Sequence, residues 1–330
     1  MKALFLNSDK TLELKEVSIP EIGADEVLIS LKASALNHRE LWIQQGLYPG
    51  MKLPCILGAD GAGVITKLGE NVHTQLLGKE VILYPAYDWG DKKEYPNRNF
   101  RVLGMPDPGT IAEYIAIPST HFVEKPTYLS FEEAAAIPVA FLTAWRALVT
   151  LGQIDASKKI LITGIGGGVA QAGLALAIAF GCKVYVTSSK QEKIDFAKQR
   201  GAEGGVNYKQ EDWHLHLKEM TNSIDIVLDS SPDPVLDRYL KFLNYGAKIV
   251  AYGSTGSRKT SLNISKFFLR HIQFIGTAMG SPKEFEALLN FMSEHHIKPI
   301  IHAQYSLDQS ITALVELKKA NHIGKIVISH

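Results

Sequence analysis

Cysteine is almost absent from this chain of 330 residues, which contains only Cys55 and Cys182. Two thiols are too few for a structural zinc site of four thiolates, and they form no C-x-x-C pair. Cysteines outside such patterns usually behave as small apolar residues. We therefore expect both side chains to be buried in the core.

An excess of charge of either sign is also missing, because 35 Lys and Arg residues are balanced by 34 Asp and Glu residues. The net charge of +1 implies no broad basic surface, so nucleic acid is not an expected partner. The N-terminal segment MKALFLNSDKTLEL has only a short apolar run and lacks the pattern of a signal peptide. The sequence thus favours a soluble, cytoplasmic protein.

One apolar run, residues 164–182, is about long enough to cross a membrane. It begins with a cluster of glycines and lies between two strand patterns. A helix packed between a sheet and a second domain would also be apolar on most faces, so we expect no membrane span. The composition, 46% hydrophobic and 21% charged, is that of a globular protein, and the length suggests two domains.

The same run belongs to the most informative pattern in the chain. Residues 160–163 are typical of a buried strand, four glycines follow within residues 164–168, and residues 169–180 predict an apolar helix. Residues 183–187 predict a second strand. Strand, glycine turn, helix and strand open a dinucleotide-binding βαβ unit, in which the glycines admit a pyrophosphate to the helix N-terminus.

The glycine spacing departs from the usual G-x-G-x-x-G/A. Gly167 and Ala170 take the second and third glycine positions, and Ile165 takes the first, with a glycine on each side. Only Gly and Ala fit where the helix and the strand nearly touch. The flanking strand and helix support the dinucleotide-binding interpretation in spite of the departure.

The rest of the chain divides into two patterns. Residues 1–124 predict mostly short strands separated by prolines and glycines, as in a small β-barrel. Helical spacing begins after Ser130, a plausible N-cap, and covers residues 131–136 and 141–151. Six strands then alternate with helices, which predicts a parallel, doubly wound sheet. The strands are residues 160–163, 183–187, 206–207, 224–228, 248–252 and 272–275, and one of the helices is predicted over residues 234–243.

These features resemble the medium-chain dehydrogenase/reductases, and among them the zinc-free, quinone oxidoreductase-like branch. The resemblance covers essentially the whole chain. It rests on LGADGAGVI (57–65), AAAIPVAFLTAWRAL (134–148), ILITGIGGGVA (160–170), NYKQED (207–212), IVLDS (226–230) and GKIVIS (324–329).

The resemblance implies an α/β fold of two domains. A GroES-like β-barrel catalytic domain would comprise residues 1–124 and 279–330. A six-stranded, doubly wound, parallel Rossmann domain that binds NADP would comprise residues 125–278. The active site would lie in the cleft between them.

Residue types at the family's metal positions argue against zinc. Zinc-dependent members carry a thiolate before a His, and later Gly-His-Glu. This chain has Asn37 before His38, and Ala59 and Asp60 after Gly58. Ala and Asn cannot replace the ligands that zinc needs, so the sequence predicts no metal.

The end of the second Rossmann strand indicates the nucleotide. NAD sites place a carboxylate there for the ribose hydroxyls, but this chain has Ser188, Ser189 and Lys190. Hydroxyls and a nearby Lys190 or Lys193 suit a 2′-phosphate, so we expect NADPH. The resemblance favours Lys193 together with Tyr208. The alternative is that Lys190 and Lys193 are solvated charges at a helix start.

Further cofactor contacts follow from the glycine turn, the fifth strand end and the resemblance. Thr143 resembles the residue whose hydroxyl lies near the nicotinamide ribose, although it could be a core-helix threonine. Asp229 ends the fourth strand at the same sheet edge, but could simply cap a turn. The predicted cofactor-binding residues are Thr143, Gly166, Gly167, Gly168, Val169, Ser188, Ser189, Lys193, Tyr208, Gly253 and Ser254.

Without zinc to polarise a carbonyl, the acceptor must take a hydride readily. Quinones and α,β-unsaturated carbonyls do so, and the protein then needs positioned hydrogen-bond donors. The catalytic candidates are Asn37, Arg39 and Tyr48. By resemblance, Asn37 faces the nicotinamide and Tyr48 lies over the substrate cleft. The structural alternatives are a turn-forming Asn37, a half-buried Tyr48, and an Arg39 paired with Glu40 or Asp60.

We therefore expect an NADPH-dependent, zinc-independent oxidoreductase that transfers hydride to quinones or α,β-unsaturated carbonyls. The alternatives are a zinc-independent alcohol or aldehyde oxidoreductase of the same fold, and a non-catalytic NADPH-binding redox sensor. Family members commonly pair their last Rossmann strands across a two-fold axis. Residues 271–276 would form that edge, so we expect a homodimer, no membrane partner and a small-molecule substrate.

Overall fold

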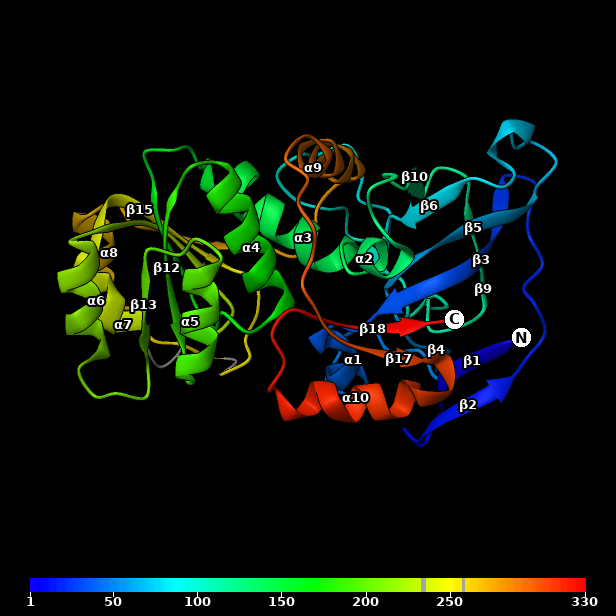
Figure 1. The fold of residues 1–330 in the computed structure, drawn as a ribbon, viewed down its shortest axis with the longest axis horizontal. Coiled ribbons are helices and arrows are strands. Elements are labelled where there is room, and N and C mark those ends of the chain that lie inside the picture. Colours follow the sequence, from blue (N-terminus) through cyan, green and yellow to red (C-terminus); the bar gives the residue numbers. More distant parts are fainter. Residues whose placement is uncertain (233–235, 257–258) are drawn as a thin grey trace. The chain divides into compact units, whose positions relative to one another are not determined.

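The computed structural model describes residues 1–232, 236–256 and 259–330, without the side chains of residues 237 and 239. These residues form two compact units, one of Met1–Ala140 with Ser281–His330 and the other of Phe141–Gly280 (Figure 1). The first residues of the helix predicted over 234–243 lie outside the described residues. Its remainder is α7 (Leu236–Tyr239) and a 3₁₀ turn (Leu240–Phe242).

The first unit is rich in strands and is built from both parts of the chain. Its largest sheet has the order β10-β6-β5-β3-β18-β17, and β9 also pairs with β3. All of these pairs are antiparallel except β17 with β18. The strands are β3 (Glu26–Ala35), β5 (Asp60–Leu68), β6 (Glu80–Leu83), β9 (Tyr114–Pro118), β10 (Phe122–Glu124), β17 (Ile301–Ser306) and β18 (Lys325–Ser329).

Smaller elements complete the first unit. A second sheet has the order β2-β1-β4, and two short strands, β7 and β8, pair with each other. The strands are β1 (Lys2–Leu6), β2 (Leu12–Glu16), β4 (Cys55–Ile56), β7 (Ala86–Tyr87) and β8 (Arg101–Val102). The helices are α1 (His38–Gln44), α2 (Phe131–Ala135), α9 (Pro282–Glu294) and α10 (Ser310–Lys319).

The two cysteines, Cys55 in the first unit and Cys182 in the second, are both buried, as expected.

Residues 125–140 were expected in the Rossmann domain, but they belong to the first unit. The reason lies in their contacts, because α2 packs on β3 and β5, and the Val139 backbone N–H donates to Asp60 Oδ1 at 2.8 Å.

The predicted cap of α2 is confirmed. Ser130 Oγ accepts from the Glu133 backbone, and Glu133 Oε2 accepts from the Ser130 backbone.

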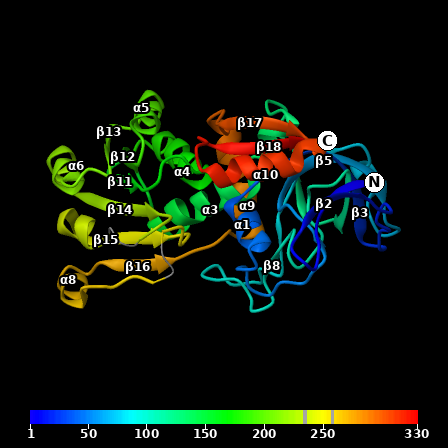
Figure 2. The ribbon, with the colours of Figure 1, turned by 90° about the horizontal axis from the view of Figure 1, so that it is seen from below.

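The second unit contains one parallel sheet with the order β13-β12-β11-β14-β15-β16 (Figure 2). The predicted six strands and their parallel pairing are therefore confirmed. The strand order reverses between β11 and β14, which is the point where dinucleotides bind in such sheets. The strands are β11 (Lys159–Ile162), β12 (Lys183–Ser188), β13 (Gly204–Asn207), β14 (Ile224–Asp229), β15 (Leu243–Ala251) and β16 (Gln273–Gly276).

Alternate strand residues enter two separate cores, which shows that helices cover both faces of this sheet. Ile160 and Ile162 pack with α4 (Gly168–Ala179) and α5 (Gln191–Gln199), whereas Leu161 packs with α6 (Trp213–Thr221). The helix α8 (Ile264–Leu269) precedes β16. Within the described ranges, no helix combines the length and the apolar character that crossing a membrane requires.

The helix predicted over residues 141–151 changes form along its length. It begins as α3 (Pro138–Trp145) and continues as a π-helix (Arg146–Gly152), which ends at Gln153 with a positive φ of 58°. A π-helix is seldom recognisable from sequence, because it is rare and extends over only a turn or two within an α-helix.

Candidate functional site

The glycine turn leaves the N-terminus of α4 open. Gly164 has a positive φ of 63°, and the Gly167 backbone N–H donates to its carbonyl at 3.3 Å. Gly167 is the N-cap, and a Cβ placed there would meet no heavy atom closer than Gly164 O at 4.0 Å. The free backbone N–H groups at the start of this 12-residue helix can therefore donate hydrogen bonds to an anion, so the turn fits a nucleotide diphosphate.

Two residues that the motif does not specify hold this turn and helix in place. Gln171, the one polar residue in the apolar helix, is buried and donates from Nε2 to the Ile165 carbonyl at 2.6 Å. Gly173 allows the helix to lie close to the sheet, because a Cβ there would overlap the Leu228 Cδ2 methyl. The motif gave this role to Ala170, which lies one turn earlier and is also buried.

The end of β12 is a polar turn without a carboxylate. Ser188 is buried, and its Oγ accepts from the Lys190 backbone N–H at 3.1 Å. The carbonyl groups of Ser188 and Ser189 accept from the Tyr208 backbone and from Asn207 Nδ2, at 3.0 and 3.3 Å. Hydrogen bonds from the end of β13 thus hold Ser188 and Ser189, the segment that would contact the adenosine ribose, in place.

The two candidate lysines differ in burial. Lys190 is partly exposed, with 41% of its side chain accessible, and pairs with Glu192 at 3.4 Å, as expected of a solvated charge. Lys193 is only 7% exposed, so the solvated alternative is wrong for it. Burial, with the charge of Lys190, lowers the pKa of the Lys193 ammonium. A buried cation with a lowered pKa gains from a phosphate nearby. Tyr208 is exposed on the adjoining segment.

Polar residues also gather at the carboxyl ends of β11, β14 and β15. Asp229 is buried and accepts from Thr163 Oγ1 at 2.7 Å and from the Ser231 backbone at 2.8 Å, so it caps this turn. Gly253 follows β15, where a Cβ would lie 3.1 Å from the Ser230 carbonyl. Ser254 follows it and is partly buried, and Thr143 is buried on α3.

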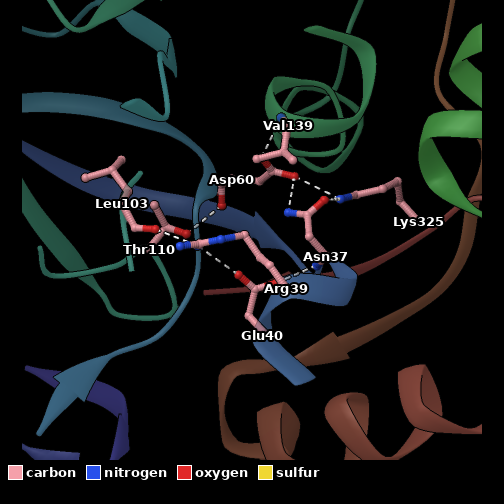
Figure 3. A network of polar contacts seen from close by, with 8 residues as sticks. All are labelled: Asn37, Arg39, Glu40, Asp60, Leu103, Thr110, Val139 and Lys325. Atoms are coloured by element: carbon pink, nitrogen blue, oxygen red, sulfur yellow. Dashed lines mark hydrogen bonds and ion pairs between the residues drawn. The ribbon is translucent and has the colours of Figure 1, made fainter. Parts of the chain in front are cut away.

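In the first unit, Asn37 belongs to a buried polar network (Figure 3). Its Nδ2 donates to Asp60 Oδ2 at 2.9 Å, and its Oδ1 accepts from Lys325 Nζ at 2.6 Å. Lys325 Nζ also pairs with Asp60 Oδ2 at 2.8 Å. Asp60 is 0% exposed and Lys325 is 4% exposed, whereas Asn37 is partly exposed. The network therefore reaches the surface of this unit through Asn37.

Arg39 and Glu40 extend this network (Figure 3). Arg39 Nη1 pairs with Glu40 at 3.3 Å and donates to the Leu103 carbonyl at 2.7 Å, while the guanidinium carbon lies 4.8 Å from the centre of the Tyr48 ring. The structural alternative for Arg39, an ion pair with Glu40 or Asp60, is therefore present in its Glu40 form. Burial raises the pKa of the Glu40 carboxyl, although Arg39 and the Asn37 backbone N–H oppose the shift. Arg39 Nε and Nη2 are buried without a partner among the described residues.

Sequence reasoning missed Lys325. The only available signal was one lysine at the start of the apolar run KIVIS, which reads equally well as the exposed first residue of a strand. Its partners, Asn37 and Asp60, are 288 and 265 residues away in the chain.

The donor set at this network does not fit a zinc ion. Asn37 and Asp60 already bind an ammonium group, and Ala59 has no ligand atom. The exposed His38 stacks edge-on against Trp42, with ring centres 5.5 Å apart. Among residues 1–232, 236–256 and 259–330, no group of three or more His, Cys, Asp or Glu side chains could hold a metal ion.

Known proteins match both units. Residues 23–127 match the alcohol dehydrogenase GroES-like domain, and residues 168–294 match the family described as zinc-binding dehydrogenase. The chain is 37% identical to the zinc-type alcohol dehydrogenase-like protein YogA of Leptosphaeria maculans, over 96% of this chain and 94% of that protein.

Other relatives carry different names. The chain is 30% identical to an acryloyl-coenzyme A reductase of Sulfurisphaera tokodaii over 99% of both proteins. It is 28% identical to a quinone oxidoreductase of Homo sapiens, over 89% of this chain and 85% of that protein. Among solved structures, an NAD-dependent alcohol dehydrogenase matches with a TM-score of 0.93, 31% identity and full coverage of both chains.

These matches confirm the α/β fold with a GroES-like domain and a parallel Rossmann sheet. The open glycine turn agrees with the nicotinamide cofactor that such enzymes bind. This chain belongs to the medium-chain dehydrogenase/reductase family of oxidoreductases.

Proposed function

We propose that this protein is an NADPH-dependent oxidoreductase that transfers hydride, without zinc, to quinones or α,β-unsaturated carbonyls. One observation carries the proposal. The Lys325 ammonium binds both Asn37 and Asp60. By the family resemblance, these two residues match positions of the metal-site motifs. A site of this kind offers hydrogen-bond donors rather than a Lewis acid, and it suits acceptors that are already electron-poor.

NADPH is proposed as the cofactor because of the residues around β12. Ser188 and Ser189 stand where NAD enzymes place a carboxylate, and Lys193 is a nearby buried cation. Gly166, Gly167, Gly168 and Val169 would hold the diphosphate at the N-terminus of α4, with Gly253 and Ser254 at the sheet edge. Bound nicotinamide would supply the hydride.

The first unit would bind the acceptor. Asn37 Nδ2 carries two hydrogens, and one donates to Asp60. The second has no acceptor among the described residues, and Asn37 is partly exposed, unlike Asp60 and Lys325. It can donate to the acceptor oxygen as negative charge develops there. For an enone, hydride adds to the β-carbon, the electron pair moves to oxygen, and a proton from water completes the reduced product.

The experiment is a panel of acceptors tested with NADPH and with NADH, using the purified protein and measuring its metal content. The panel includes 9,10-phenanthrenequinone, 3-buten-2-one and an aliphatic aldehyde. We expect the protein to reduce the quinone and the enone with NADPH while it contains less than about one zinc ion per ten chains. Addition of EDTA should leave the rate of reduction unchanged. Turnover that requires zinc, or reduction of the aldehyde alone, would refute the proposal, and tight NADPH binding without turnover would favour a redox sensor.

We also propose a homodimer formed through the edge of the second unit. Among the described residues, β16 pairs only with β15, so one of its edges is open. Phe274 on this strand is exposed, as are Phe268 and Leu269 on the neighbouring α8 and Tyr245 on β15. An apolar, unpaired edge of this kind favours pairing with a second copy of the chain.

A further inference from the structure

We propose that Lys325 is a positioning residue, whose ammonium fixes the orientation of the Asn37 amide and so presents the second Asn37 N–H to the acceptor oxygen. This inference rests on the proposed function and adds a residue that was not among the expected site residues.

The hydrogen bonds permit only one orientation of the amide. Asn37 Oδ1 accepts from the Lys325 ammonium at 2.6 Å, while Nδ2 donates to the Asp60 carboxylate at 2.9 Å. Rotating the amide by 180° would place its N–H groups against the ammonium and its carbonyl oxygen against the carboxylate. Both contacts would then be repulsive, so the two charges together specify where the second N–H points.

The charged partners are themselves fixed. Asp60 Oδ1 accepts from the Val139 backbone N–H at 2.8 Å, and the Asp60 carbonyl accepts from Thr110 Oγ1 at 2.6 Å (Figure 3). Lys325 is the first residue of β18, and its backbone N–H donates to the Ile300 carbonyl at 2.8 Å. Neither side chain can move far without leaving a buried charge unpaired.

Burial separates the roles of the three residues. Asp60 and Lys325 lie in the interior of the first unit, and only Asn37 is partly exposed. A substrate at this surface could therefore touch Asn37, but not the two charges behind it. Lys325 acts through Asn37, which makes it a positioning residue rather than a catalytic one.

A double-mutant cycle between Asn37 and Lys325 tests this inference. Lys325→Met should lower kcat about 10- to 100-fold, because the donor loses its orientation, and should leave the KM for NADPH nearly unchanged. In an Asn37→Ala background the same change should lower kcat no further. Independent losses that multiply in the double variant would overturn the inference.

Two further variants separate positioning from stability. Asp60→Asn with Lys325→Met removes both charges, so it should recover thermal stability relative to Lys325→Met without recovering kcat. Lys125→Met is the matched control, because Lys125 is also buried and pairs with Glu80 at 3.0 Å, away from Asn37. It should lower stability and keep kcat. Recovery of kcat in the first variant, or an equal loss in the control, would contradict the inference.

A spectroscopic measurement keeps the inference separate from the proposed function. In protein labelled with [¹⁵N]asparagine, the Asn37 side-chain signals can be assigned by their loss in Asn37→Ala. We expect Lys325→Met to shift or merge them and Lys125→Met to leave them in place. A wild-type enzyme that reduces none of the acceptors would refute the proposed function only, whereas unmoved Asn37 signals in Lys325→Met would refute the inference about Lys325.

Discussion

The glycine turn and the helix behind it yield a prediction in which cofactor binding and stability change separately. At Gly167, a Cβ would meet nothing closer than 4.0 Å, and the backbone is extended, with φ of −74° and ψ of 157°. Alanine fits this conformation. We expect Gly167→Ala to change the free energy of unfolding by less than about 1 kcal/mol, the usual range for changes between Gly and Ala at an N-cap.

The same methyl group would occupy the space over the helix N-terminus. A diphosphate would then lie farther from the backbone N–H groups that bind it. A loss of about 1.4 kcal/mol corresponds to a tenfold weaker Kd, so we expect NADPH affinity to fall about tenfold or more. Isothermal titration calorimetry with NADPH measures this directly.

Gly173 should show the opposite pattern. A side chain there overlaps the Leu228 methyl, and Leu228 is itself fully buried, so it has little room to move. Overpacking of this kind costs about 1–3 kcal/mol. We expect Gly173→Val to lower the thermal midpoint by several degrees while the folded fraction binds NADPH normally.

For the first variant, a wild-type NADPH affinity in folded Gly167→Ala would refute the placement of the diphosphate at the glycine turn.

Four further predictions concern other parts of the chain. Lys193→Met should lower the preference for NADPH over NADH about tenfold or more, measured as the ratio of the two kcat/KM values. An unchanged ratio would exclude Lys193 from the phosphate site. Phe274→Asp should convert a dimer to monomers in analytical ultracentrifugation, whereas a dimer that survives must use another surface. Asp60→Ala should lower the free energy of unfolding by about 3–5 kcal/mol in urea titrations, because it leaves the Lys325 ammonium buried and unpaired. A smaller loss would show that water reaches the ammonium. Burial lowers the pKa of His330 to about 4, from an ordinary value of 6.5, so the unfolded chain binds more protons between these values and stability falls as pH drops from about 6.5 to about 4. His330→Gln should remove about 2 kcal/mol of this acid-induced loss in urea titrations at pH 7 and pH 4.5. An unchanged difference between the two pH values would contradict this.

Local patterns predicted the second unit well. Short β-branched runs alternating with helices were enough to identify six parallel strands, because a buried parallel strand carries its signal within a few residues. The cap at Ser130, in the first unit, was equally local. Gly173 was not recognised, since its role depends on the Leu228 side chain of another strand.

The first unit was harder to predict in detail. Residues 125–140 belong with it because of Asp60 and the sheet under α2, and these contacts join distant parts of the chain. The same is true of Lys325. Sequence identified Asn37 and Asp60 as replacements for metal ligands, but only the fold shows that a lysine from the other end of the chain binds both of them.

The position of β18 has a consequence for synthesis on the ribosome. The second unit needs no residue beyond Gly280, but β18 lies between β3 and β17 in the largest sheet of the first unit. Until translation passes residue 329, β3 lacks one neighbour and Asp60 lacks its cation. A nascent chain therefore holds an unfinished sheet until β18 has been made, and a chain that stopped before β18 would contain a complete second unit together with an incomplete first unit.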